Sequence, residues 1–168
     1  GAVLCGFPVD PGGVADLGEM LAGVGEAGMR DESAAALLAD FNSAFEPART
    51  PFDWLSRDPA EVDAYVADPF CGNDHALTFG YYIDLFGVVA PAVERLGKVA
   101  CPCLVIAGDQ DPAAAMGANA TAIAAALGEA GVPTDLRLYE GARHELLNET
   151  NRDEVTADVI AWYNALAR

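Results

Sequence analysis

The sequence predicts an α/β protein in which parallel strands pack against flanking helices. A short apolar segment of strand character, residues 2–5, is followed by a mainly helical region over 14–97, and residues 98–168 then alternate strand, helix, strand and helix. Strands that alternate with helices pair in parallel through right-handed crossovers. We therefore expect one parallel sheet, with a helical region inserted between its first strand and the next.

The composition indicates one folded domain and excludes several kinds of partner. The chain has 168 residues, of which 52% are hydrophobic, which is enough for a sizeable core. Its 26 acidic and 9 basic residues give a formal net charge of −17 that is scattered along the chain. Because nucleic acid and anionic membrane surfaces repel this charge, we expect neither as a partner. No apolar run has membrane-spanning length, so no membrane insertion is expected.

The cysteines show no spacing typical of a disulfide framework or of a metal site. They are Cys5, Cys71, Cys101 and Cys103. Free thiols in a reducing cytoplasm are therefore expected, and no metal is.

The first half of the chain is expected to be helical after its opening strand. Gly6 ends the strand at residues 2–5. A helix is predicted over about 14–28, although its glycines lower helix stability. The next helix is predicted to begin with Asp31 or Ser33 as its N-cap. Its expected apolar face consists of Leu37, Leu38, Phe41 and Phe45.

Two prolines predict further helix starts, because proline is favoured at the first helical position. The first start is Thr50-Pro51 and the second is Asp58-Pro59, where Glu61 occupies the reciprocal capping position. Residues 75–86 and 90–97 also have helical character.

In the second half of the chain, the spacing of apolar residues changes from a helical pattern to alternating strand and helix patterns. Residues 102–107 are a continuous apolar run, which is typical of a strand buried on both faces. An alanine-rich helix over 114–130, ended by Gly131, precedes a second strand at Asp135–Tyr139. The last helix is predicted to start near Asn151. Its apolar face consists of Val155, Val159, Trp162 and Leu166.

An acid and an imidazole follow these two strands. Asp111 comes just after the first strand and His144 just after the second. Because parallel strands end at the same edge of a sheet, where open α/β sheets bind ligands, we expect the two side chains to lie close together. A carboxylate placed there accepts the imidazole Nδ1–H and stabilises the imidazolium that forms on proton transfer. The sequence therefore predicts Asp111 and His144 as catalytic residues.

Asp109 is a local competitor for Asp111, whereas the second histidine lies far from the pair in the sequence. Asp109 precedes Asp111 by two positions and is either a turn former or the alternative acid. His75, the other histidine, is expected at an exposed helix N-terminus.

Several longer stretches resemble the α/β-hydrolase superfamily, and most closely the serine aminopeptidase S33 hydrolases with the monoacylglycerol lipases and lysophospholipases. These stretches are Leu104-Val105-Ile106-Ala107-Gly108-Asp109-Gln110-Asp111-Pro112, Leu138-Tyr139-Glu140-Gly141-Ala142-Arg143-His144-Glu145, Leu146-Leu147-Asn148-Glu149, Ala161-Trp162 and Asp68-Pro69-Phe70-Cys71-Gly72. The resemblance implies the C-terminal half of such a hydrolase. Residues 1–9 would hold strand 6 of its sheet, residues 10–97 a helical cap, and residues 98–168 the β-α-β-α end with strands 7 and 8.

The resemblance implies a Ser-Asp-His triad that hydrolyses carboxylic esters, without metal or organic cofactor. Asp111 matches the family's acid and His144 its general base. The nucleophile is expected in a Gly-x-Ser-x-Gly elbow, and none of Ser33, Ser43 and Ser56 has glycines at that spacing. We therefore expect an N-terminal half as the partner that carries the nucleophile and the oxyanion hole, and we expect this chain alone to be inactive.

Aromatic residues of the expected cap suggest a substrate class. Phe70, Phe79, Tyr82 and Phe86 either line an apolar acyl pocket or form the cap's own core. An apolar cap over a triad favours small-molecule esters, lipid-like or alkyl and aryl, over peptides.

Two other functions remain open. The strand that ends in Asp109-Gln110-Asp111 is similar to the strand that ends in the Asp-x-Asp motif of haloacid-dehalogenase-type phosphatases. In those enzymes the first aspartate is the nucleophile, and Mg²⁺ neutralises the negative charge of the reacting group. Here Gly108 precedes the pair, and Ala113 stands where threonine or valine is expected. The third function is non-enzymatic: a degenerate half-domain that binds a partner chain through the open edge of the strand at residues 2–5.

Overall fold

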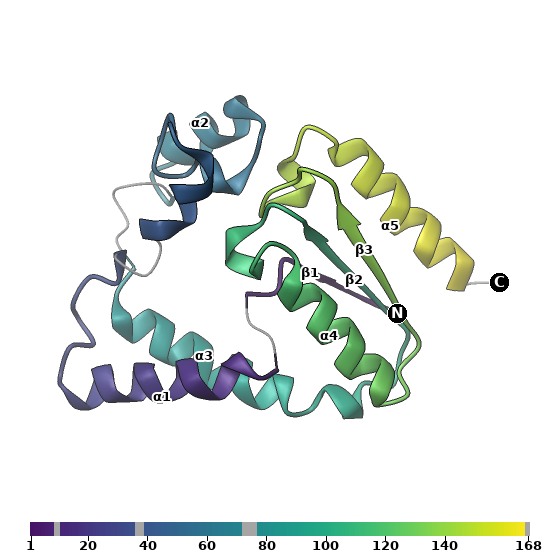
Figure 1. The fold of residues 1–168 in the computed structure, drawn as a ribbon, viewed down its shortest axis with the longest axis horizontal. Coiled ribbons are helices and arrows are strands. Elements are labelled where there is room, and N and C mark those ends of the chain that lie inside the picture. Colours follow the sequence, from purple (N-terminus) through teal and green to yellow (C-terminus); the bar gives the residue numbers. More distant parts are fainter. Residues whose placement is uncertain (9–10, 36–38, 72–76, 167–168) are drawn as a thin grey trace.

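The structure, a computed structural model, describes residues 1–8, 11–35, 39–71 and 77–166. Its sheet has the order β1-β2-β3, and both neighbouring pairs are parallel (Figure 1). The strands are β1 (Ala2–Cys5), β2 (Cys103–Gly108) and β3 (Thr134–Tyr139). The α/β class and the three expected strands are confirmed.

The central strand β2 is buried along its whole length because helices cover both faces of the sheet. Cys103, Val105 and Ala107 pack with α4 (Ala118–Glu129) on one face. Leu104 and Ile106 point to the other face, toward α5 (Arg152–Leu166). The last helix carries Val155, Val159 and Trp162 into this second cluster, as its apolar face predicted, while Leu166 is exposed.

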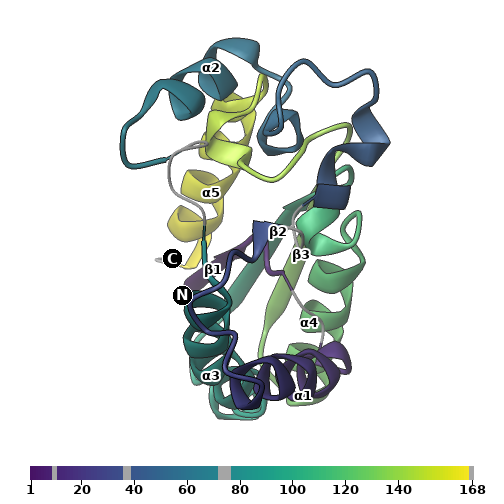
Figure 2. The same ribbon diagram turned by 90° about the vertical axis from the view of Figure 1, so that its left-hand side faces the viewer.

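The connection between β1 and β2 contains α1 (Gly13–Glu26), α2 (Pro59–Ala67) and α3 (Phe79–Val93). Helices α1 and α3 lie side by side, and their cluster includes the buried Leu21 and Phe86 (Figure 2). Helix α2 lies at the other end of the molecule, beyond the carboxyl ends of the strands (Figure 1). None of the helices in the described ranges is long and apolar enough to cross a membrane.

Helix α1 and the predicted start of α2 are confirmed, whereas the start at Thr50-Pro51 gives only a 3₁₀ helix. Helix α1 begins one residue before the predicted range, and the Asp58 side chain accepts the Ala60 N–H at the start of α2. After Thr50-Pro51 the chain forms only a short 3₁₀ helix, Asp53–Leu55, because the Thr50 hydroxyl is held by the Phe52 N–H and by Asp53.

The helix predicted after Asp31 or Ser33 is not α-helical in the described residues. Ser33 instead forms an isolated antiparallel bridge with Thr78, and the Ala34 N–H donates to the Leu77 carbonyl at 2.8 Å. A 3₁₀ helix covers Ala39–Phe45, and Leu37 and Leu38 lie outside the described residues. The pairing with residues around Thr78 competes with the local helix.

The helices predicted over 75–86 and 90–97 are one helix. Helix α3 begins after Thr78, whose hydroxyl accepts the Tyr81 N–H, and continues through Pro91 to Val93. A 3₁₀ helix at Leu96–Lys98 completes the segment. Pro91 has no N–H to donate to the Gly87 carbonyl, so α3 loses one hydrogen bond there and ends two residues later.

Helix α4 begins at Ala118, later than the predicted residue 114. A 3₁₀ helix, Pro112–Ala114, comes first, and the next residues are left-handed, with φ of 49° at Ala115, 53° at Met116 and 82° at Gly117. Left-handed residues cannot join a right-handed helix, so α4 starts only after them. This curled segment directly follows Asp111.

Candidate active site

Asp111 and His144 form a hydrogen-bonded pair at the carboxyl edge of the sheet. The His144 Nδ1 lies 2.9 Å from Asp111 Oδ2. The Asp111 side chain is fully buried, whereas 28% of the His144 side chain is exposed. A buried carboxylate that accepts Nδ1–H leaves Nε2 as the basic nitrogen on the accessible side of the ring.

The other carboxylate oxygen of Asp111 is held by its own loop. Oδ1 accepts the Ala113 N–H at 2.9 Å and the Ala114 N–H at 3.3 Å. The Asp111 carbonyl accepts the Met116 N–H at 2.8 Å, which the left-handed residues make possible. Asp111 therefore caps a turn with one oxygen and presents the other to the imidazole.

Direct backbone contact joins the loops after β2 and β3. A Cβ atom added at Gly108 would lie 2.0 Å from the Ala142 carbonyl oxygen, so only glycine fits there. The Gln110 N–H donates to the same carbonyl at 3.0 Å. The Asp109 carboxylate accepts the Gly141 N–H at 2.8 Å. Asp109 is thus a link between the loops, and in the described residues it makes no hydrogen bond to His144.

The imidazole of His144 is surrounded by two other segments. The Trp54 ring lies 5.1 Å from it, centroid to centroid, at an interplanar angle of 43°. At the end of β1, a Cβ atom at Gly6 would lie 3.4 Å from His144 Cε1. Trp54 is a site residue that sequence reasoning did not identify.

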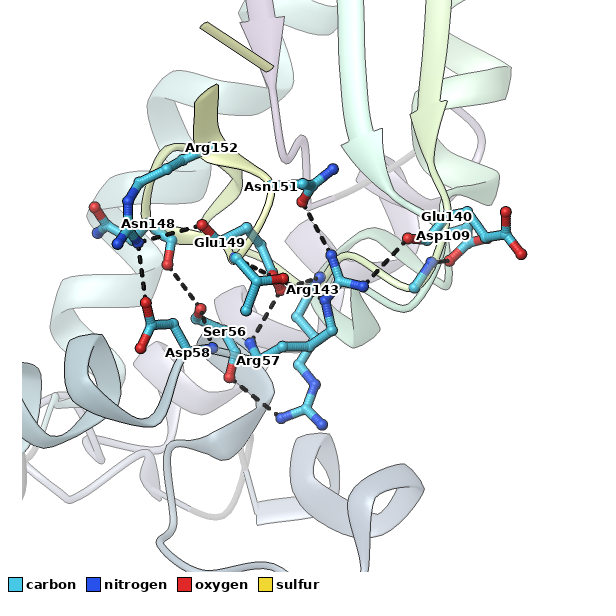
Figure 3. A network of polar contacts seen from close by, with 12 residues as sticks. Ser56, Arg57, Asp58, Asp109, Glu140, Arg143, Asn148, Glu149, Asn151 and Arg152 are labelled. Carbon is cyan, nitrogen blue, oxygen red and sulfur yellow. Dashed lines mark hydrogen bonds and ion pairs between the residues drawn. The ribbon is translucent and has the colours of Figure 1, made fainter. Parts of the chain in front are cut away.

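A polar network lies next to the pair (Figure 3). The Glu149 side chain is fully buried and accepts hydrogen bonds from Arg57 and from the Arg143 N–H. Burial opposes ionisation of Glu149, but the hydrogen bonds from Arg143 and Arg57 outweigh it and hold its pKa below the ordinary value. Sequence reasoning did not identify Arg57 or Glu149; the only signal was that the resembling stretch extends to Glu149.

The remaining predicted residues lie elsewhere. Phe79, Tyr82 and Phe86 pack in the cluster between α1 and α3, and Phe70 is 84% exposed and lies outside that cluster. The structure therefore does not bring the four aromatic residues together. His75 lies outside the described residues.

The structure places no serine on the imidazole within the described residues. The Ser43 hydroxyl donates to the Asp40 carbonyl and the Ser56 hydroxyl to the Asn148 carbonyl. Partial desolvation of the sulfur and the nearby Asp111 carboxylate raise the pKa of the Cys5 thiol, although the residue as a whole is exposed, so it is a protonated thiol at neutral pH. Across the described ranges, His, Cys, Asp and Glu form no group of three or more that could hold a metal ion.

A parallel sheet flanked by helices, with an aspartate paired to a histidine at its carboxyl edge, is the architecture of an α/β hydrolase. Residues 23–151 match the family model of the serine aminopeptidases S33, and the chain belongs to this family.

Individual relatives are esterases and lipases. A monoacylglycerol lipase of Mycolicibacterium smegmatis is 31% identical over 110 residues, which make up 66% of this chain and 38% of the lipase. A thermostable carboxyl esterase from Bacillus coagulans, solved in complex with glycerol, has a TM-score of 0.80 and 28% identity. That likeness covers 97% of this chain and 56% of the esterase.

Two further solved structures share the fold. A lipase in an open form has a TM-score of 0.74 and 23% identity, over 99% of this chain and 57% of the lipase. The monoacylglycerol lipase of Paleococcus ferrophilus has a TM-score of 0.55 and 19% identity, over 80% of this chain and 55% of that protein. The chain thus spans between 38% and 57% of the length of these relatives.

Proposed function

We propose that the complete protein is a serine hydrolase of carboxylic esters in which His144 is the general base and Asp111 orients it. The observation that carries this proposal is the 2.9 Å contact between His144 Nδ1 and the buried Asp111 Oδ2. The nucleophilic serine and the oxyanion hole are proposed to come from residues outside this chain, which alone is then inactive.

The proposed chemistry has two steps. Nε2 of His144 takes the proton of the serine hydroxyl as its oxygen attacks the ester carbonyl, and then returns that proton to the departing alcohol. Water hydrolyses the acyl-enzyme by the same route. Asp111 holds the ring in the tautomer that leaves Nε2 basic and stabilises the imidazolium in both steps.

The relatives support a small-molecule ester as the substrate, because those at 28% identity or more are named as a monoacylglycerol lipase and a carboxyl esterase. We propose residues 10–97 as the cap region, of which α2 and residues 53–57 lie at the carboxyl edge of the sheet beside the site. The four cysteines are free, which supports a reducing cytoplasm as the location.

The proposal is tested first by fluorophosphonate labelling of the natively purified protein, with an intact mass for each labelled species. We expect label on a polypeptide that includes this chain or co-purifies with it. His144→Ala should abolish both the labelling and the hydrolysis of p-nitrophenyl butyrate, while His75→Ala serves as the matched control. Label absent from material that contains a longer or a second polypeptide, or label retained in His144→Ala, would contradict the proposal; label absent from this chain alone is expected.

We further propose that Phe70 contributes to acyl binding, because its side chain is 84% exposed. Phe79, Tyr82 and Phe86 pack in the cluster between α1 and α3, which favours the alternative that they form the cap's own core. Hydrolysis by the complete enzyme should rise from acetyl to octanoyl esters, and Phe70→Ala should reduce the rise. A flat profile in the unmodified enzyme would exclude an apolar acyl site.

A further inference from the structure

Glu149 is surrounded by hydrogen-bond donors (Figure 3). Its Oε1 accepts the Arg57 N–H at 3.0 Å and the Arg143 N–H at 2.9 Å. Its Oε2 accepts the Arg57 Nε–H at 2.8 Å and the Thr150 N–H at 2.9 Å. Because the side chain is fully buried, these protein groups replace water around the carboxylate.

The donors come from two segments far apart in the sequence. Arg57 lies in the β1–β2 connection, just before α2, whereas Arg143 directly precedes His144. Further bonds join the same two segments: the Glu145 N–H donates to the Leu55 carbonyl at 2.8 Å, and the Ser56 hydroxyl donates to the Asn148 carbonyl at 2.8 Å. Residues 53–57 therefore lie along the loop at residues 143–149.

The side chain of Arg143 adds to this attachment. Its guanidinium donates to the carbonyls of Asp53 and Ser56 and stacks over the Phe45 ring at 4.0 Å. His144 thus lies between two residues, Arg143 and Glu145, that are both bound to segment 53–57. Trp54 of the same segment packs against the imidazole.

We propose that Glu149 is a positioning residue for His144. Its buried carboxylate binds Arg57 and the Arg143 main chain together and so keeps the loop at residues 143–149 on segment 53–57, with the imidazole directed at Asp111. This role rests on the proposed function, in which His144 is the general base. In this role, Glu149 makes the orientation of the His144 imidazole depend on how the β1–β2 connection packs against the loop at residues 143–149.

The substitution Glu149→Gln tests this role because the glutamine amide cannot accept all the hydrogen bonds that the carboxylate accepts. Both oxygens of Glu149 face N–H donors, so either orientation of glutamine points its NH₂ group at another donor. Asp58→Asn is the matched control. It removes a nearby ion pair between the connection and α5, to Arg152 at 3.1 Å, and keeps an N-cap on α2.

Two measurements on the complete protein read out the effect. By ¹⁵N NMR, we expect His144 of the unmodified protein to be the single tautomer protonated at Nδ1, and expect Glu149→Gln to show a mixture of tautomers. We expect kcat for p-nitrophenyl butyrate to fall ~100-fold, with KM little changed, because a misplaced base weakens the chemical step. Asp58→Asn should match the unmodified protein in both measurements.

A folded Glu149→Gln protein with a single Nδ1-protonated tautomer and unchanged kcat would overturn the role. If that variant does not fold, Arg57→Met decides, since it keeps an unbranched side chain but removes every side-chain N–H that reaches Glu149; tautomer and kcat at their unmodified values would again overturn the role. The proposed function has its own test, because it fails if His144→Ala still hydrolyses the ester. The effect of Glu149→Gln on the His144 tautomer is measured by NMR and does not depend on that result.

Discussion

At the scale of single residues, three acids near the site differ in what their carboxylates face. Asp111 faces an imidazole, Asp109 faces the Gly141 N–H, and Glu149 faces Arg57 and the Arg143 N–H. The first arrangement suits proton transfer, and the other two hold loops in place. The residue type alone does not distinguish these roles, because the partner of each carboxylate decides it.

The two aspartates should respond differently to substitution by asparagine in the complete enzyme. Asp111→Asn should lower kcat by about 10⁴-fold, because an amide favours the wrong imidazole tautomer. Asp109→Asn should keep most of the activity and lower the free energy of unfolding by about 1 kcal/mol, through a weakened bond to Gly141. Ester hydrolysis and urea unfolding measure the two effects. A larger loss of kcat in Asp109→Asn would make Asp109 the catalytic acid.

Tyr139 provides a pH-dependent prediction. Burial and the neighbouring Asp158 carboxylate, which accepts the phenolic O–H at 3.2 Å, raise the pKa of Tyr139 from 10.0 to about 12. Between these values the unfolded chain loses the proton while the folded chain keeps it, so stability should fall as pH rises from 10.0 to about 12.

Unfolding by urea across this alkaline range measures the effect. Tyr139→Phe should show a smaller alkaline loss of stability than the unmodified chain. Tyr81→Phe, at a ring that is 49% exposed, is the control and should leave the loss unchanged. An equal alkaline loss of stability in the unmodified chain and in Tyr139→Phe would contradict the raised pKa of Tyr139 as its cause.

At the scale of elements, the ends of β2 and β3 are close enough to bring their loops together. Gly108 allows the end of β2 to touch the backbone at Ala142, and the hydrogen bond from Gln110 N–H to Ala142 closes the contact. Three left-handed residues after the 3₁₀ helix Pro112–Ala114 then turn the chain into α4. The site depends on these two irregular features more than on the length of any helix.

Gly108→Ala should therefore destabilise the fold. The added Cβ, 2.0 Å from the Ala142 oxygen, forces the two loops apart, and we expect a loss of at least about 2 kcal/mol in the free energy of unfolding. Gly128→Ala in α4 is the control, because nothing lies within 4 Å of its Cβ. It should be neutral or stabilising by up to about 1 kcal/mol. Similar unfolding midpoints for the two variants would contradict the close contact.

At the scale of the whole molecule, the protein combines a large negative charge with a small three-stranded sheet. The net charge is −17, and Arg57 and Arg152 are both engaged in ion pairs that attach the β1–β2 connection to the C-terminal part. Within the described residues β1 pairs only with β2, and the chain covers 56% of the carboxyl esterase. Both observations fit the proposal that the nucleophile and the oxyanion hole come from residues outside this chain.

The charge predicts that salt stabilises the fold. We expect repulsion among the acidic residues to outweigh the ion pairs, and added salt screens this repulsion over a Debye length of about 10 Å at 0.1 M. The Tm followed by circular dichroism should rise as sodium chloride increases. A Tm that falls with salt would show that ion pairs, including Arg152 with Asp58 and Glu61, dominate the electrostatics.

Sequence patterns were sufficient for the α/β class, the three strands, the N-cap of α2 and the placement of Asp111 and His144 at strand ends. These features are encoded within short windows, as a buried apolar run, a capping residue or the position after a strand. The boundaries that sequence misplaced, at Ser33, Pro91 and Ala115, are those where a distant pairing, a tolerated proline or left-handed backbone overrides local preference.

Tertiary structure alone decided what surrounds the imidazole of His144. Arg57 and Glu149 are 92 positions apart, and Trp54 reaches His144 from the same distant segment. No local pattern encodes such contacts, because they exist only after the β1–β2 connection packs on the loop that follows β3. The strand pattern therefore determines that the acid and the base lie at the same edge of the sheet. The packing of residues far apart along the chain determines their exact position.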